Sequence, residues 1–118
     1  MKAQDLMIGD WVRPLNVNSP FQIVEIGPDY ICNYSDTAIW VLDEIEPIPI
    51  TAEILEKNGF IYNDIPFVLA WEQFGLSIYG THGNYRINCG QNVGMDVSYV
   101  HQLQHALRLC QIEKEIQL

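Results

Sequence analysis

Short runs of strand-forming residues, each broken within a few positions by turn residues, most constrain how this chain can fold. In the first fifty residues four such runs recur at a spacing of about ten residues, at 10–13, 21–26, 30–34 and 37–42. The segments between them, such as Pro14 to Pro20 and Gly27-Pro28-Asp29, have the composition of turns. This spacing predicts a small β-meander or barrel over residues 1–48.

The segment Glu46-Pro-Ile-Pro-Ile-Thr51 divides the chain. Each proline pushes the residue before it out of the helical region, so the segment is predicted to be extended. We interpret it as a hinge between the β-subdomain at 1–48 and an α+β subdomain at 51–118, although a chain of 118 residues also has the length of one fused domain.

The second half is predicted to contain a short helix, an antiparallel meander, a longer helix and a closing strand. Thr51 is a suitable N-cap for a helix over 52–58, and Gly59 can supply its left-handed stop. Glycine-containing turns then separate four strand-forming runs, at 60–62, 67–74, 76–79 and 85–89. A helix is predicted over 97–110 with Asp96 or Ser98 as N-cap, and the alternating segment 112–118 reads as a strand.

The helix over 97–110 has two different faces. At 100° per residue, one arc of about 120° holds the residues expected to pack on the sheet, namely Tyr99, Val100, Leu103, Ala106, Leu107 and Cys110. The opposite face holds His101, Gln104, His105 and Arg108 and is expected to be exposed. We take His101, His105 and Arg108 as a candidate partner surface.

His101 and His105 stand one helical turn apart, which is the spacing of two ligands for one metal. Gln102 occupies the position of the general-base glutamate of the H-E-x-x-H motif, and the sequence offers no third ligand. We therefore predict no metal site and no other cofactor.

The cysteines Cys32, Cys89 and Cys110 are three in number and widely spaced. This pattern favours buried thiols over a disulfide framework or a zinc site. Cys89 and His82 border one predicted hairpin and are the best nucleophile and base that the chain offers. Because nothing supplies an oxyanion hole, we predict no catalytic residue.

Charge restricts the partners of the chain. Fifteen acidic and six basic residues give a formal charge of −9, and residues 1–50 alone carry eight acids and two bases. Such a field repels nucleic-acid backbones and anionic lipid surfaces, so we predict neither a nucleic-acid nor a membrane partner. An acidic decoy for a DNA-binding site is the alternative explanation.

The distribution of apolar residues bears on location. No uninterrupted apolar run exceeds five residues, whereas a membrane-spanning helix needs about 20. Asp5 and Asp10 interrupt the stretch in which a signal peptide would be apolar. These features predict a cytoplasmic protein.

Three stretches carry a resemblance to a known family. They are 3–12, beginning Ala-Gln-Asp-Leu, 45–60, with its Glu-Pro-Ile-Pro-Ile-Thr core, and 99–116, with Tyr-Val-His-Gln-Leu-Gln. The chain resembles a family of small proteins from gut Bacteroidetes that occur in prophage-like or mobile regions, and no activity is assigned to that family. Relatives tend to have glycine where this chain has Gln111, so a left-handed helix end there carries a steric cost. The Gly-Asp-Trp-Val opening at 9–12 also resembles that of small SH3-like barrels of phage proteins, which implies an SH3-like barrel or meander for residues 1–48 packed on the α+β half.

These inferences together predict a non-enzymatic interaction or accessory protein of a mobile element. We expect its partner to be an unknown protein or, in a weak homo-oligomer, a second copy of the chain. The alternatives are the acidic nucleic-acid mimic and a hydrolase that uses the His and Cys positions. We expect Trp11, Trp40 and Trp71 to be core anchors, with an aromatic groove for proline-rich peptides as the other possibility.

Overall fold

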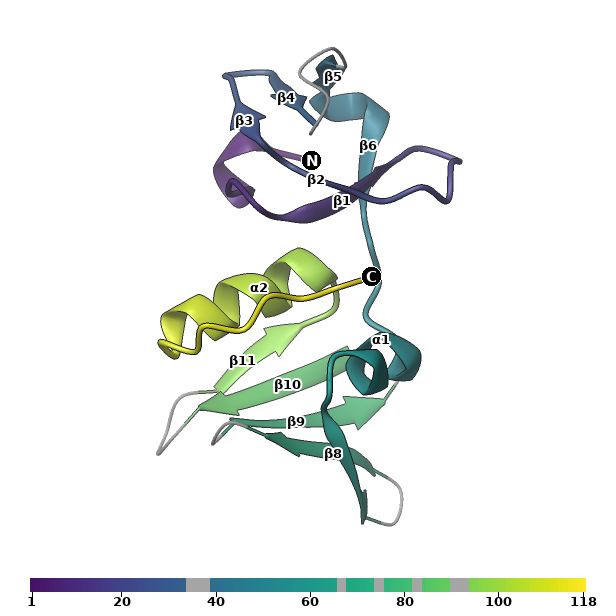
Figure 1. The fold of residues 1–118 in the computed structure, drawn as a ribbon, viewed down its shortest axis with the longest axis vertical. Helices are drawn as coiled ribbons and strands as arrows, with labels where there is room; N and C mark the ends of the chain where they lie inside the picture. The colour runs from purple at the N-terminus through teal and green to yellow at the C-terminus, as the bar shows by residue number, and fades with distance from the viewer. Residues whose placement is uncertain (34–38, 66–67, 74–75, 82–83, 90–93) are drawn as a thin grey trace. The chain divides into compact units, whose positions relative to one another are not determined.

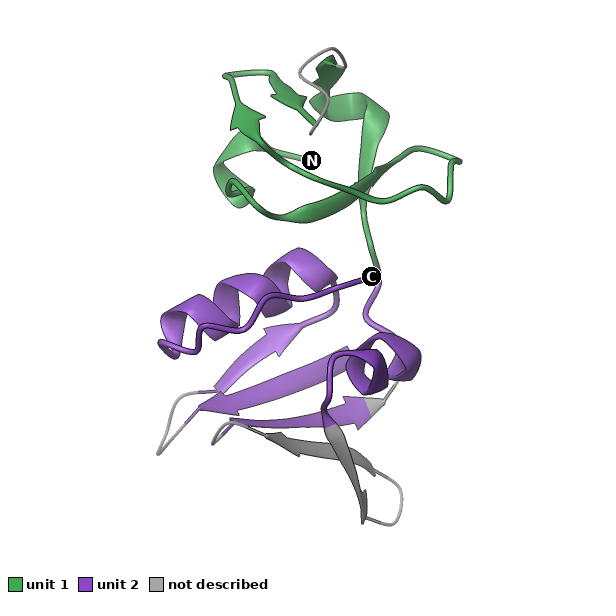
Figure 2. Ribbon diagram, viewed as in Figure 1, with its two compact units in different colours: residues 1–48 green, residues 49–118 purple. Residues whose placement is uncertain are grey.

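The computed structural model of this chain describes residues 1–33, 39–65, 68–73, 76–81, 84–89 and 94–118 (Figure 1). Two compact units follow one another along the sequence, Met1–Ile48 and Pro49–Leu118 (Figure 2). The described residues form an α+β protein with three antiparallel sheets and two α-helices.

The first unit contains two three-stranded sheets. The sheet β2-β1-β6 is built from Phe21–Gln22, Trp11–Pro14 and Ile45–Pro47. The sheet β3-β4-β5 is built from Glu25–Ile26, Tyr30–Cys32 and Ile39–Val41. Two short 3-10 helices, η1 (Ala3–Asp5) and η2 (Leu42–Glu44), complete it. The predicted strands are present, but in the part of this unit that the structure describes they form two sheets and not one closed barrel.

The predicted strand at 21–26 is two short strands. Its first residues pair with β1 and its last with β4, so the segment passes from one sheet to the other. Ile23, between the two strands, is buried and keeps a backbone hydrogen bond of 2.9 Å to the carbonyl of Asp10. A core forms where the sheets meet, and its buried members are Leu6, Val12, Ile23, Ile31 and Ile45.

The second unit is built on the predicted meander. Its five strands have the spatial order β11-β10-β9-β8-β7, and every neighbouring pair is antiparallel. In chain order they are β7 (Ile61–Ile65), β8 (Val68–Gln73), β9 (Leu76–Thr81), β10 (Asn84–Cys89) and β11 (Gly94–Val97). Strand β11 was not expected, because its short Gly-Met-Asp-Val sequence joins directly to the helical pattern that follows it.

Helix α1 (Ala52–Lys57) has the predicted caps. The Thr51 hydroxyl accepts a hydrogen bond from the backbone N–H of Ile54 at 3.2 Å. At the other end Gly59 is left-handed with φ 84°, and its N–H donates to the carbonyl of Glu56 at 3.0 Å. The N–H of Phe60 donates to the carbonyl of Leu55, also at 3.0 Å, which completes a Schellman motif.

Helix α2 (Val100–Leu109) begins later than predicted, beside strand β11 (Figure 1). Neither Asp96 nor Ser98 is its N-cap, because β11 extends to Val97 and Tyr99 takes the cap position. The side-chain oxygen of Gln102 accepts hydrogen bonds from the backbone N–H groups of Ser98 and Tyr99, at 2.7 and 3.2 Å.

The end of α2 repeats the Schellman motif with a different residue. The N–H of Gln111 donates to the carbonyl of Arg108 at 3.0 Å, and that of Ile112 donates to the carbonyl of Leu107 at 2.9 Å. Gln111 is left-handed with φ 59°, in the place that Gly59 has after α1. The predicted steric cost at Gln111 is therefore present in the fold.

The predicted closing strand at 112–118 is wrong. These residues have the predicted alternation of burial, with Ile116 at 1% exposure between exposed neighbours, but they join no described strand. Instead the Asn58 side chain holds the segment. Its amide nitrogen donates to the carbonyl of Gln117 at 2.8 Å, and its amide oxygen accepts from the N–H of Gln117 at 2.7 Å. The buried Asn58 thus provides the two hydrogen bonds that a neighbouring strand would provide.

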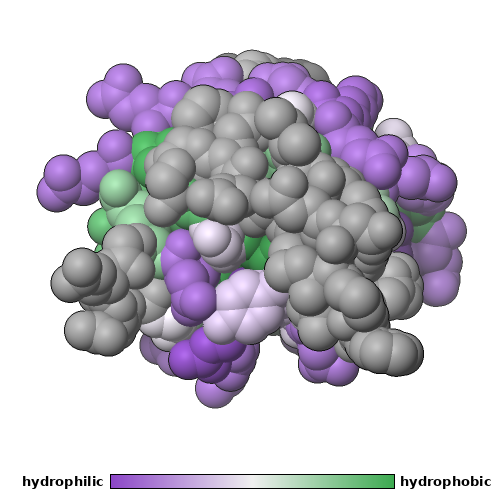
Figure 3. All heavy atoms as spheres, turned by 90° about the horizontal axis from the view of Figure 1, so that it is seen from below, coloured by the Kyte–Doolittle hydropathy of each residue, from purple (hydrophilic) through white to green (hydrophobic). Residues whose placement is uncertain are grey.

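The two faces of the C-terminal sheet differ in polarity. One face carries the buried side chains of β9, β10 and β11, which are Leu76, Ile78, Tyr85, Ile87 and Val97. The other carries polar side chains, and in the view of Figure 3 most of the described surface is hydrophilic. Among the described residues, no helix has both the length and the apolar composition needed to cross a membrane.

Candidate functional site

The three residues of the candidate partner surface are not equally accessible on α2. His101 is buried, with 6% of its surface exposed, while His105 is half-buried and Arg108 is exposed. The rings of Tyr99 and His101 are stacked, with their centroids 6.0 Å apart. The ring of His105 packs edge-on against the His101 ring, with their centroids 5.7 Å apart. The expectation that all three side chains lie on an exposed face is therefore wrong for His101.

The helical projection places His101 opposite the apolar stripe and so assumes that only the stripe of α2 is covered by the rest of the protein. Gln104, on the same predicted polar face, is also buried, with 7% exposed. Leu103 and Leu107 are buried as predicted, so the buried part of α2 is wider than a single apolar stripe. His101 is therefore not part of an exposed contact surface, and Arg108 is the exposed member of the three.

The two imidazoles do not form a metal centre with other ligands that the structure describes. In the described ranges there is no group of three or more histidine, cysteine, aspartate or glutamate side chains that could hold a metal ion. A structural zinc site needs four ligands and a catalytic one needs three.

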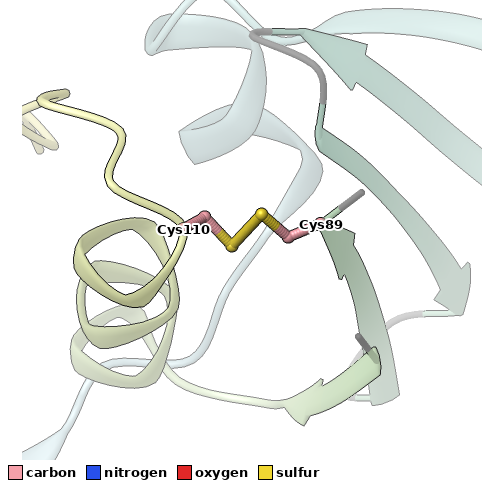
Figure 4. Close-up of a disulfide and its surroundings, with 2 residues drawn as sticks. All are labelled: Cys89 and Cys110. Carbon is pink, nitrogen blue, oxygen red and sulfur yellow. A yellow bond between two sulfur atoms is a disulfide. The ribbon is translucent and has the colours of Figure 1, made fainter. Parts of the chain in front are cut away.

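Cys89 and Cys110 form a disulfide, which corrects the prediction that all three cysteines are separate thiols (Figure 4). Cys89 ends strand β10 and Cys110 follows α2, and their Cα atoms lie 6.1 Å apart. That distance is within the range that a disulfide spans. The sequence gives no sign of the pairing, because the two cysteines have a sequence separation of 21 and the strand and helix between them bring them together only by packing.

This disulfide removes the proposed nucleophile. A sulfur bonded to another sulfur cannot serve as a thiolate, so Cys89 cannot attack a substrate while the bond is intact. Its suggested base, His82, lies outside the described residues. Cys32 is a buried thiol outside the disulfide, as predicted, and its Sγ lies 3.4 Å from a carboxylate oxygen of Glu25.

Strand β5 presents apolar side chains to solvent on the N-terminal unit. Ile39 is 65% exposed and Val41 is 45% exposed, and both lie on the face opposite Trp40, which packs against the core. Ile39 pairs with Cys32 of β4, and Val41 pairs with Tyr30. The ring of Tyr30 covers Gly27, where any side chain would collide with it. Because β5 is an edge of its sheet, this apolar row lies beside an open strand edge.

Next to Val41 the surface is hollowed. The hollow has a volume of about 840 Å³, is open to solvent, and is lined by three segments of the first unit, 1–4, 28–29 and 41–43. Pro28, Val41 and Leu42 give it apolar walls, and Asp29 and Asp43 add two exposed carboxylates. Its size is within the range of ligand-binding clefts.

No protein-family model, curated protein or solved structure matches this chain. The candidate site therefore rests on geometry alone. The sequence predicted a strand at 37–42 but not its exposed apolar face or the hollow. Ile39 and Val41 have the same residue types as core strands, and only the pairing register shows which face they occupy.

The polar face of the C-terminal sheet is the other surface with organised side chains. The Arg86 guanidinium donates to the Asp96 carboxylate at 3.0 Å, and a side chain at position 94 would collide with it, so glycine there lets Arg86 lie across β11. The Asn88 amide donates to the Tyr79 hydroxyl at 2.9 Å. These groups bond to one another, so this face offers a ligand less than the N-terminal hollow does.

Proposed function

We propose that this chain is a non-enzymatic protein-interaction protein whose contact surface is on the N-terminal unit. One observation carries the proposal. Of the large hydrophobic side chains found exposed outside residues 34–38, 61–75, 81–83 and 90–93, all but Leu109 lie within residues 1–48: Met7, Ile8, Leu15, Val17, Val24, Ile39 and Val41. Exposed apolar groups that gather on one small unit are typical of surfaces that bind other proteins.

The strand order supports an SH3-like arrangement for this unit. The segment 21–26 contributes to both sheets, and η2 stands between β5 and β6. Small barrels of this kind often act as binding modules, although a fold by itself does not determine a function. The topology therefore adds to the apolar surface as support and does not replace it.

The alternatives have less support. A hydrolase at Cys89 would first need its disulfide to be reduced. A nucleic-acid mimic needs a surface dominated by carboxylates, whereas Asp29 and Asp43 on the N-terminal unit lie among the apolar residues Pro28, Val41 and Leu42 and beside the base Lys2. A surface of mixed apolar and charged groups favours the interaction protein.

Site-specific photo-crosslinking tests the proposal. A benzoylphenylalanine is placed at position 39, and the control variant carries it at Leu109, which is equally apolar and is 74% exposed in the other unit. In the native cells we expect a protein crosslink from position 39 and none above background from position 109. An excess of unlabelled wild type should compete, and an excess of the double variant Ile39→Glu, Val41→Glu should not. Equal crosslinking from both positions, or none from position 39, would contradict the proposal.

On the family resemblance we further propose that the protein is an accessory of a mobile element and acts in the cytoplasm. Disulfides are rare in that compartment because thioredoxin and glutathione keep thiols reduced. Rapid alkylation of living cells, followed by mass measurement of the protein, tests the location together with the oxidation state. For a cytoplasmic protein we expect most copies to have alkylated Cys89 and Cys110, and a fully bridged population would argue against the cytoplasm.

A further inference from the structure

The hollow beside Val41 has the lining that suits a long, positively charged side chain. Its walls are apolar at Pro28, Val41 and Leu42, and its carboxylates come from Asp29 and Asp43. Lysine and arginine side chains have a long apolar stem and a charged end, so they bury the stem against apolar surface and keep the charge beside acids and water.

The acids in and beside the hollow outnumber its positive groups. The lining itself holds two positive groups, the Lys2 side chain and the N-terminal ammonium of Met1, and two carboxylates, those of Asp29 and Asp43. Asp5 lies in the same 3-10 helix as the lining residue Ala3, and Glu44 lies in the same one as Asp43, and both are exposed. Elsewhere in the unit the base Arg13 is already paired with Glu46 at 2.7 Å.

The strand next to the hollow supplies the second half of a binding surface. Val41 both lines the hollow and ends β5, and Ile39 lies two residues before it on the same face. Side chains two residues apart in an extended segment also share a face, so a segment that runs along β5 can place apolar side chains beside Ile39 and Val41.

We propose that the hollow binds an arginine or lysine side chain of a partner protein, presented by an extended segment whose neighbouring apolar residues cover Ile39 and Val41. The inference rests on the proposed function and adds the chemistry of the partner to it. Opposite charges across such a contact increase the association rate and exclude acidic partners.

The test uses a defined probe, an eight-residue peptide with both ends blocked. Two valines and one arginine stand at alternate positions, so that they share one face of the extended peptide, and serine fills the remaining positions. In a matched peptide, citrulline replaces the arginine, which keeps the shape and removes the charge. Both are titrated into the full-length protein labelled with ¹⁵N. We expect saturable shifts of the amide resonances of residues 29 and 41–43, with at least tenfold weaker binding of the citrulline peptide.

Two variants with the same net charge separate a local contact from the general field of an acidic protein. Asp29→Asn with Asp43→Asn removes two carboxylates at the hollow, and Glu113→Gln with Glu115→Gln removes two exposed carboxylates of the C-terminal segment. We expect at least a tenfold loss of affinity for the arginine peptide in the first variant and less than a twofold loss in the second. Amide spectra of the free variants verify that each remains folded.

Several outcomes would overturn the inference: equal losses in the two variants, shifts centred outside the hollow, equal binding of the citrulline peptide, or no saturable binding. If crosslinking from position 39 succeeds while the arginine peptide fails to bind, the interaction function stands and this account of its ligand is wrong. If the peptide binds at the hollow while position 39 captures no protein, the ligand chemistry stands and the proposed cellular function is wrong.

Discussion

At Gln111 the fold requires a backbone conformation that a residue with a side chain adopts only at a steric cost. Gln111 ends α2 in the left-handed region, with φ 59°, where the equivalent position after α1 is Gly59. A side chain with a Cβ costs about 1 to 2 kcal/mol in that conformation. The Schellman hydrogen bonds and the burial of Leu107 hold it there.

Replacing Gln111 with glycine should therefore stabilise the protein. Relief of the left-handed strain exceeds the added entropy of the unfolded chain, which costs about 0.4 to 1 kcal/mol. We expect a net gain of about 0.5 to 1 kcal/mol in the free energy of unfolding, measured by urea titration. The matched control is Gly59→Ala, which should lose stability because it creates the same strain after α1. A loss on Gln111→Gly would show that Gln111 is not strained.

Tyr85 gives the fold a dependence on alkaline pH. It is 2% exposed, and burial raises the pKa of its hydroxyl above the ordinary value of 10.0. At a pH between 10.0 and the raised pKa, the folded protein keeps the hydroxyl proton of Tyr85 and the unfolded chain loses it. The stabilisation is therefore complete below about pH 10 and is lost as the pH rises through the raised pKa.

Urea titrations at pH 9 and pH 11 test this contribution. From pH 9 to pH 11 the free energy of unfolding should fall by a larger amount in the wild type than in Tyr85→Phe, because phenylalanine has no hydroxyl proton to lose. Titrations at pH 7 give the baseline difference between the two proteins. An equal fall in both would mean that Tyr85 does not contribute to the alkaline loss.

At the scale of elements, one side chain replaces a strand partner. Asn58 at the end of α1 bonds to both backbone groups of Gln117, and its amide nitrogen also donates to the carbonyl of Ile54 at 2.8 Å. Asn58 is 3% exposed, so the carbonyls and the N–H that it satisfies are shielded from water. Residues far apart in the sequence are tied together by this one amide.

Asn58→Ala should lower the free energy of unfolding by about 2 to 4 kcal/mol, since three hydrogen bonds are lost. It should also increase hydrogen exchange at the amide of Gln117, whose N–H loses its acceptor. The control is Asn84→Ala, because Asn84 is exposed at the start of β10 and should cost about 0.5 kcal/mol or less. Unchanged exchange at Gln117 in Asn58→Ala would contradict this role.

The disulfide joins β10 to the end of α2 across a sequence separation of 21. Closing a loop of this size stabilises a fold by about 3 kcal/mol, mainly through the entropy of the unfolded chain. Cys110→Ser, or reduction of the wild type with a dithiol, should lower the free energy of unfolding by about that amount. Added dithiol should then have no further effect on Cys110→Ser. A variant as stable as the oxidised wild type would show that the bond does not constrain the chain.

At the scale of the whole molecule, the two units differ in the interactions that stabilise them. Residues 49–118 contain the five-stranded sheet, both α-helices, the disulfide and the Asn58 contact with the C-terminal segment. Residues 1–48 rely on two three-stranded sheets over a small core. Very short chains bury too small a fraction of their surface to be stable without further support.

The fragment 49–118 should therefore fold alone. We expect a cooperative urea transition and a dispersed amide spectrum that overlays most of the matching signals of the full chain. The full chain measured under the same conditions is the reference. A fragment without a cooperative transition would show that the second unit depends on residues 1–48.

Much of the secondary structure followed from sequence because its causes are local. The caps of α1 depend on Thr51 and Gly59, which act on backbone groups a few residues away. The strands of the C-terminal meander are marked by alternating runs between glycine turns, and the buried Leu103 and Leu107 follow from helical period. Each of these depends on residues close to one another in the chain.

Tertiary structure decided the rest, because the causes lie far apart in the sequence. The Cys89–Cys110 bond, the burial of His101 and the capture of Gln117 by Asn58 all depend on segments that meet only after folding. Strand pairing likewise turned Ile39 and Val41 outward, although their apolar side chains alone indicate a core strand. Local sequence therefore predicted the caps of α1, most of the meander and the apolar stripe of α2, while packing decided which side chains remain available for a partner.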